Sequence, residues 1–188
     1  MKQSSIIEIT PNKFYRIGDV ISFTLDNGEE TRAIAVKQEP NGTLFCFENC
    51  FSEYYPMNSE DSNRGGYELS EMRNMLNNRV LNLFPGEILD KMNSFSNGDF
   101  LRLPTEKEIF GENCYGASEN TFVEQWIPMK NLRNRIALSS SGDCIEWYWL
   151  SNAIDEPSPL FTVVRANGNA DYGCASNPLG VRPVFCIS

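Results

Sequence analysis

The sequence of 188 residues contains no histidine. This absence excludes catalysis by Ser-His or Cys-His pairs and every metal site that uses an imidazole ligand. The six cysteines include no C-x-x-C pair, so the close-spaced thiolates of a structural zinc site are also missing. We therefore expect six reduced thiols and no zinc.

Basic residues are scarce, because 16 lysines and arginines stand against 25 aspartates and glutamates and the formal net charge is −9. Nucleic acids and anionic membranes bind basic surfaces, so we expect neither as a partner. No apolar run is long enough to span a bilayer, and residues 1–8 lack the apolar run of a secretory signal. These features predict no membrane insertion. They also predict a protein that is cytoplasmic as synthesised, or that reaches a phage particle or the exterior by a signal-independent route.

The length is typical of one domain, residues 1–188, with a single well-buried core. Residues 1–56 contain alternating apolar runs separated by turn signals at 26–28 and 40–42, a pattern typical of an antiparallel β-meander. Residues 67–188 then form the remainder of the same domain, in which short helices precede further strands.

Three short helices are expected after the meander. Ser70 is a favourable N-cap residue, and apolar residues follow it at helical spacing as far as Val80. A second helix is expected at 87–92, just after a proline. Thr105 and Glu108 have the spacing of a capping box and predict the start of a third.

The C-terminal region, residues 141–188, alternates apolar runs with loops rich in Asn, Gly and Ser. The most continuously apolar runs are predicted to be buried strands. We expect the strand at 181–187 to be central and to pair with the strand at 147–150, with the strand at 161–164 as a neighbour.

A binding face is predicted where polar loops flank these strands. Because strand side chains alternate between faces, Trp149 and Phe161 should point into the core, and Tyr148 should lie opposite its tryptophan neighbours. Loops of Tyr, Asn, Ser and Gly are typical of adaptable binding surfaces, although the Asn-Gly and Asn-Pro pairs also fit ordinary turns. The residues predicted to form the face are Tyr148, Asn152, Asn167, Asn169, Asp171 and Tyr172.

Three motifs, in order, resemble the formylglycine-generating (sulfatase-modifying) enzyme family. Residues 101–108, LRLPTEKE, resemble its RLPTEAEWE signature, and residues 141–147, SGDCIEW, resemble its SGNVWEW segment. The runs at 163–165 and 179–182 are similar to its VLRGG strand and terminal GFR. The resemblance implies an α+β, C-type-lectin-like fold with small twisted antiparallel sheets, two or three short helices and long ordered loops.

A closer resemblance is to an uncharacterised family of bacterial and phage domains. Its S-x-LR-x-WLN helix, WWLRS strand and terminal GVRPAF are similar to residues 70–77, 148–152 and 180–185. The chain departs from this pattern where Met75 replaces the helix tryptophan and Ser151 replaces the arginine. Any role of that arginine is therefore lost here.

The resemblance has two chemical implications. The formylglycine enzymes oxidise a substrate cysteine through a cysteine pair between the VLRGG-like strand and the terminal GFR, and this chain has only Cys174 in that window. We therefore expect no such cysteine-dependent oxidase activity and no cofactor. The SGNVWEW loop of those enzymes helps to hold calcium, which makes Asp143 and Glu146 calcium candidates, although the same two carboxylates also fit a solvated turn.

The combined expectation is a non-enzymatic module that binds or displays a ligand, with a protein or a cell-surface ligand as its partner. The same fold carries the variable proteins of diversity-generating retroelements, which place their variability in this C-terminal region. Two alternatives stay open. One is a structural subunit of a phage-like particle, and the other is a diverged enzyme related to the formylglycine family.

Overall fold

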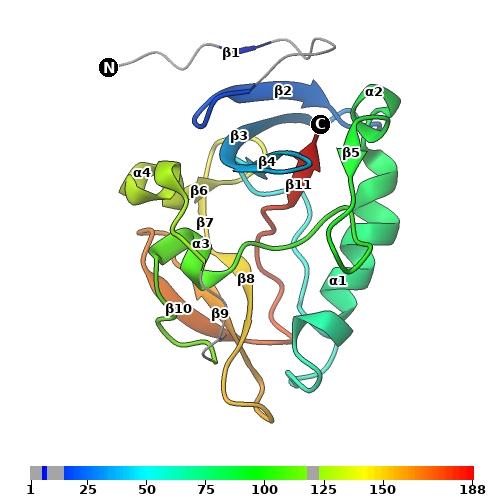
Figure 1. The fold of residues 1–188 in the computed structure, drawn as a ribbon. Coiled ribbons are helices and arrows are strands. Elements are labelled where there is room, and N and C mark those ends of the chain that lie inside the picture. Colours follow the sequence, from blue (N-terminus) through cyan, green and yellow to red (C-terminus); the bar gives the residue numbers. More distant parts are fainter. Residues whose placement is uncertain (1–5, 8–14, 118–122) are drawn as a thin grey trace.

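The computed structural model of the chain describes residues 6–7, 15–117 and 123–188. It has a mixed α+β architecture in which a six-stranded, a three-stranded and a two-stranded sheet combine with short helices. Figure 1 shows the large sheet at the top, α1 along one side of the molecule, and the three-stranded sheet at the lower end of the opposite side. Every pairing between named strands is antiparallel except that of β1 with β2. The coarse α+β prediction is confirmed.

The large sheet contains the N-terminal strands and the end of the chain. Its strands are, in spatial order, β1 (Ile6–Ile7), β2 (Val20–Thr24), β3 (Glu30–Glu39), β4 (Gly42–Phe47), β11 (Val184–Ile187) and β5 (Met92–Asn93). β2, β3 and β4 form the antiparallel meander that the turn signals predict. At the β3–β4 turn, a Cβ on Gly42 would lie 2.3 Å from the carbonyl oxygen of Ile187. Glycine is therefore needed where β11 passes the turn.

The predicted pairing of the last strand with the strand at 147–150 is wrong. β11 lies between β4 and β5, with Phe185 opposite Phe45. The chain meets β8 only briefly, where Trp149 N–H donates to the carbonyl oxygen of Gly180 at 3.1 Å. The carbonyl oxygen of Val181 already accepts from Phe51 N–H at 2.8 Å, and that of Pro183 accepts from Phe47 N–H at 3.1 Å, so the chain leaves β8 before β11 begins. The continuous apolar run at 181–187 correctly predicted a buried strand, but it did not indicate with which strand it would pair.

The three-stranded sheet has the order β10 (Ala170–Cys174), β9 (Leu160–Val164) and β8 (Tyr148–Ala153). β8 and β9 are antiparallel neighbours, with Tyr148 opposite Val164 and Trp149 opposite Val163, but they do not share a sheet with β11 as predicted. β10 is an edge strand. A separate two-stranded sheet contains β6 (Ala137–Leu138) and β7 (Ile145–Glu146).

Helix starts follow the local signals in the sequence. The hydroxyl oxygen of Ser70 accepts a hydrogen bond from Arg73 N–H at 3.1 Å, and the predicted helix begins there. Thr105 and Glu108 form the predicted capping box at the third helix. The helical segments are η1 (Tyr67–Leu69), α1 (Glu71–Met75), the π-helical turn η2 (Leu76–Val80), η3 (Leu81–Leu83), α2 (Gly86–Leu89), α3 (Glu106–Phe110), η4 (Ile127–Lys130) and α4 (Leu132–Arg135).

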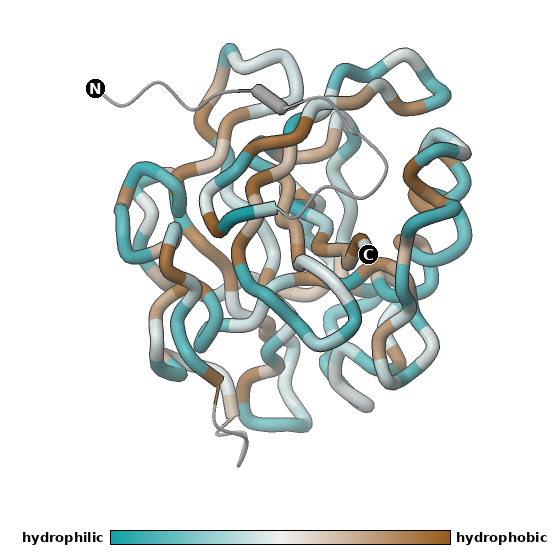
Figure 2. Tube along the Cα trace, turned by 45° about the horizontal axis from the view of Figure 1, so that its top comes forward, coloured by the Kyte–Doolittle hydropathy of each residue, from teal (hydrophilic) through white to brown (hydrophobic). Residues whose placement is uncertain are grey.

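The large sheet is buried on both faces. Phe45 and Phe47 of β4 belong to one apolar cluster together with the buried residues of α1 and η2. Leu44 and Cys46 point the other way, into a second cluster that includes Ile109 of α3. Figure 2 shows hydrophobic residues along the inner strands and hydrophilic residues along the peripheral loops. Within the described residues, no helix is long and apolar enough to cross a membrane.

Candidate binding face

Tyr148 was predicted to lie on an exposed face, and this prediction is wrong, because its side chain is fully buried. It does point away from Trp149, but that side of β8 is covered too, and Tyr148 packs in the cluster that contains Val164. Its hydroxyl donates to the carbonyl oxygen of Arg135 at 2.9 Å and accepts from Arg182 Nη1 at 3.0 Å. Burial raises the pKa of Tyr148 to about 12, although the Arg182 guanidinium partly opposes this. Tyr148 is therefore a neutral structural hydrogen-bonding group.

Asn152 was also predicted to be exposed and is instead buried within β8. Its Oδ1 accepts the backbone N–H of Glu106 at 2.8 Å, at the start of α3. The neighbouring chain is so close that a Cβ on Gly116 would lie 2.5 Å from the Asn152 Cβ. Asn152 therefore joins helix and strand, and it is not part of an exposed face.

Asn167 and Asn169 lie in the tight turn between β9 and β10 and are exposed there. Asn167 Oδ1 accepts the backbone N–H of Asn169 at 3.1 Å, which is a local turn-stabilising bond. Gly168, between them, has φ +78 and faces Leu132 of α4. Asn167 thus stabilises the turn, and both asparagines lie beside the exposed edge of the sheet.

Asp171 and Tyr172 are adjacent on β10 and so point to opposite faces of the strand. Asp171 forms an ion pair with Arg165, whose guanidinium carbon lies 5.3 Å from the centre of the Trp147 ring. On the other face, Tyr172 is 47% exposed. The predicted single face is therefore divided by an edge strand.

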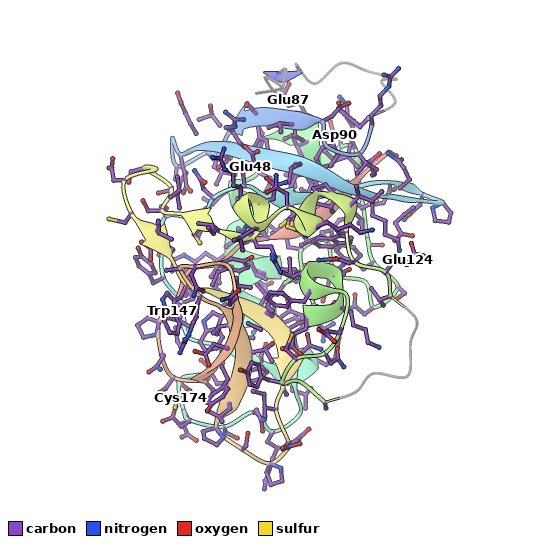
Figure 3. The ribbon with its side chains drawn as sticks, turned by 90° about the vertical axis from the view of Figure 1, so that its left-hand side faces the viewer. Glu48, Glu87, Asp90, Glu124, Trp147 and Cys174 are labelled. Carbon is purple, nitrogen blue, oxygen red and sulfur yellow. The ribbon has the colours of Figure 1, made fainter. Side chains whose placement is uncertain are left out.

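Two aromatic residues at this edge were not among the predicted face residues. Trp147 was expected to share the buried side of Trp149, but it is 37% exposed, and Figure 3 shows it at the margin of the molecule, with Cys174 on the same side. Tyr115 is 46% exposed, and its ring stands edge-to-face with that of Tyr172 at 5.4 Å between centroids. We use the term β10 rim for the five side chains Tyr115, Trp147, Arg165, Asp171 and Tyr172.

Tyr115 reaches the rim because a buried carboxylate holds its loop. Glu106 is fully buried, and its oxygens accept the backbone N–H groups of Tyr115 at 3.1 Å and Gly116 at 2.8 Å. Desolvation raises the pKa of Glu106, while the backbone hydrogen bonds partly lower it. Local sequence patterns do not predict this contact, because the loop that Glu106 holds has no regular structure. That loop places Tyr115 beside Tyr172 of β10.

The calcium candidates lie near the two-stranded sheet. Asp143 is exposed in the turn before β7, and Glu146 Oε1 accepts a hydrogen bond from the hydroxyl of Tyr54. Across residues 6–7, 15–117 and 123–188, no group of three or more acidic or thiol side chains is placed to hold a metal ion. Asp143 and Glu146 therefore stay calcium candidates on the resemblance alone.

All six cysteines are free thiols. Cys174 lies half-buried on β10, whereas Cys186 is buried on β11 in the other sheet. Burial raises the pKa of Cys50 to about 12, so this thiol is a poor nucleophile. The remaining cysteines are Cys46, which is buried, and Cys114 and Cys144, which are exposed.

The motif residues behind the family resemblance have structural roles in this chain. Glu108 Oε1 pairs with Arg102 at 2.6 Å, and its other oxygen accepts the N–H of Thr105 at 2.9 Å, so the carboxylate is fully engaged. Arg182 is buried against Tyr148. Comparison of the chain with protein-family models, curated proteins and solved structures found no match.

Proposed function

We propose that the chain is a non-enzymatic module that binds a protein or cell-surface ligand through the β10 rim. The observation that carries this proposal is the pair of half-exposed tyrosine rings, Tyr115 and Tyr172, packed edge-to-face beside an edge strand. Aromatic side chains provide large and rigid contact areas and are enriched where proteins bind one another. Trp147, stacked with Arg165 on the other face of β10, adds a further exposed aromatic ring to the rim.

The rim is held in place before any partner arrives. Tyr115 is fixed through the Glu106 carboxylate, and Trp147 lies beneath the guanidinium of Arg165, which is itself paired with Asp171. Groups that are already ordered lose little conformational entropy on binding. The outer edge of β10 has no strand partner within the described part of the chain, so an extended segment of a partner could pair with it.

A C-type-lectin-like scaffold is part of the proposal. Its support is that the resembling motifs occupy defined positions, with residues 101–108 at the capped start of α3 and residues 180–185 running into β11. On this proposal the region that retroelement-diversified relatives vary would include the β10 rim. A phage or prophage context is consistent with the closer resemblance of residues 148–152 and 180–185.

Site-specific photo-crosslinking tests the binding face. The photoreactive residue p-benzoylphenylalanine replaces Tyr172 in one variant and Leu69, which is 78% exposed on η1, in a matched control. In extracts of the producing cells, we expect a discrete adduct from position 172 and none from position 69. Adding Trp147→Ala to the position-172 variant should remove the adduct.

The result can also contradict the proposal. Adducts of equal yield from both positions, or an adduct that survives Trp147→Ala, would show that the rim is not a specific surface. An adduct between two copies of this chain would instead favour the alternative of a structural subunit in a larger particle.

A further inference from the structure

A hollow of about 440 Å³ lies between the β3–β4 side of the large sheet and α4. Three arginines line it, Arg32, Arg133 and Arg182, together with one acidic side chain, that of Glu48. Figure 3 shows Glu48 between the large sheet and the α4 helix. The excess of basic over acidic side chains in this hollow contrasts with the net charge of −9 of the chain. It also contrasts with a second hollow, which is lined by two glutamates and one arginine, Arg102.

Arg182 is the most constrained of the three arginines, with 1% of its surface exposed. Its Nε donates to the carbonyl oxygen of Phe47 at 2.9 Å, and Nη1 donates to the carbonyl oxygen of Asn134 at 3.1 Å and to the hydroxyl of Tyr148. Among the described residues, Nη2 has no hydrogen-bond acceptor. One face of this guanidinium is therefore fixed by the protein, and one nitrogen is left for another acceptor.

The charge of Arg182 is not neutralised by its neighbours. No carboxylate of the described chain lies within ion-pairing distance of it. Burial holds Tyr148 and Cys50, both close by, in their neutral forms by raising the pKa of each. A buried cation without a counter-charge is costly, and an anion at the hollow would reduce that cost.

The other two arginines differ in what they can offer. Arg32 Nε is paired with Glu48 Oε2 at 2.7 Å, so most of its charge is already balanced. Arg133 is exposed at the rim of the hollow and forms no ion pair with any residue in the described ranges. The free positive charge of the hollow thus comes from Arg133 and Arg182, which both line it.

We propose that this hollow binds the oxyanion group of a small organic ligand, either a carboxylate or a phosphate ester, between Arg133 and Arg182. Guanidinium groups bind such planar or tetrahedral oxyanions through charge-assisted hydrogen bonds. The volume falls within the range of about 300–1,000 Å³ that is usual for small-molecule sites. Ile34, Ile136 and Leu138 also line the hollow and provide an apolar wall for the body of the ligand.

Calorimetric titration with four simple probes tests the site. Inorganic phosphate, phenyl phosphate, acetate and benzoate are each titrated at constant ionic strength in sodium chloride. We expect saturable binding in which the phenyl-bearing probe is at least about tenfold tighter than its parent ion, because the ring buries apolar area against the isoleucine wall. Preference for phenyl phosphate over benzoate, or the reverse, identifies which oxyanion the site selects, and either supports the proposal.

Three variants connect the binding to these residues without disturbing buried Arg182. Arg133→Gln should weaken the tightest probe by about tenfold or more, through loss of a charged donor. Glu48→Gln should tighten it several-fold by removing the acidic group, an effect that a purely structural role would not produce. Arg64→Gln, at an exposed arginine outside the hollow, is the matched control and should leave affinity unchanged. Absence of saturable binding, or equal binding by the Arg133 and Arg64 variants, would overturn the proposal.

Discussion

β10 and β11 are neighbours in the sequence but differ in what they contribute. All four residues of β11 are buried, between β4 and β5, whereas no residue of β10 is fully buried and Tyr172 is 47% exposed. β11 belongs to a sheet with apolar clusters on both faces, and β10 is the free edge of a smaller sheet. An aromatic residue therefore stabilises the fold in one strand and is free for recognition in the other.

The largest expected effect comes from truncating an aromatic residue of β11. Phe185 is fully buried, and its ring centre lies 5.7 Å from that of Phe45 and 5.4 Å from that of Phe84. Phe185→Ala should lower the free energy of unfolding by about 3–5 kcal/mol, because it leaves a cavity that the sheet and helix cannot close. Urea denaturation followed by circular dichroism measures this loss.

The matched change in the edge strand is Tyr172→Ala. Because about half of this residue is exposed and no strand among the described residues lies beyond β10, the loss should be within about 1 kcal/mol. Similar losses for Phe185→Ala and Tyr172→Ala would contradict the division between a structural strand and a recognition strand.

The second-largest effect on stability is expected from removing the hydroxyl group of a buried tyrosine, and a second tyrosine of the same small sheet is the control. Tyr148→Phe removes the hydroxyl that bonds both Arg135 and Arg182, which leaves buried polar groups unpaired. We expect a loss of about 1–3 kcal/mol. Tyr172→Phe removes a solvated hydroxyl and should change stability by less than about 0.5 kcal/mol. If Tyr148→Phe were as mild as its control, the buried network around Arg182 would not be the stabilising contact that its geometry indicates.

Local sequence patterns predicted some features of the fold correctly and missed others. The caps at Ser70 and Thr105 were predictable because their partners lie three residues away, at Arg73 and Glu108. Alternation along β8 correctly placed Tyr148 opposite Trp149. It could not show that both faces of β8 would be covered, because α3 reaches β8 only through the tertiary fold.

The pairing of β11 and the position of Tyr115 were beyond such patterns for the same reason. An apolar run predicts burial equally well beside β4 or β8, and only the tertiary fold decides between them. Tyr115 lies in an irregular segment whose position depends on the carboxylate of Glu106, nine residues earlier in the chain. Contacts between residues far apart in sequence leave no periodic signal.

A smaller and pH-dependent effect is expected at Glu106. Desolvation raises its pKa in the folded chain above the ordinary value, so the folded state favours the protonated form. The stability that this group contributes is therefore fully present below its unfolded pKa and is lost as the pH rises through the higher folded pKa. Relative to Glu106→Gln, the wild-type protein should become less stable as the pH is raised from about 4 to about 7.

Urea titrations of both proteins across that range measure the difference. The Glu106→Gln protein should also show a weaker contact between Tyr115 and Tyr172, because an amide nitrogen would face one of the backbone N–H groups that the carboxylate accepts. A stability difference that is constant with pH would mean that Glu106 titrates alike in the folded and unfolded chains.

The smallest effect on stability is expected at Arg165, where the comparison of the two strands is sharpest. This side chain is half exposed, pairs with Asp171 and covers the ring of Trp147. Exposed ion pairs contribute little, so Arg165→Gln should change the free energy of unfolding by less than about 0.5 kcal/mol. Loss of the guanidinium should nonetheless free the indole, which shifts the tryptophan emission and lowers the yield of the position-172 adduct.

Arg79→Gln, which removes a similar exposed cation over Tyr55 outside the rim, is the control and should leave the adduct unchanged. If Arg165→Gln left the adduct yield as high as its control does, the order of the rim would play no part in binding.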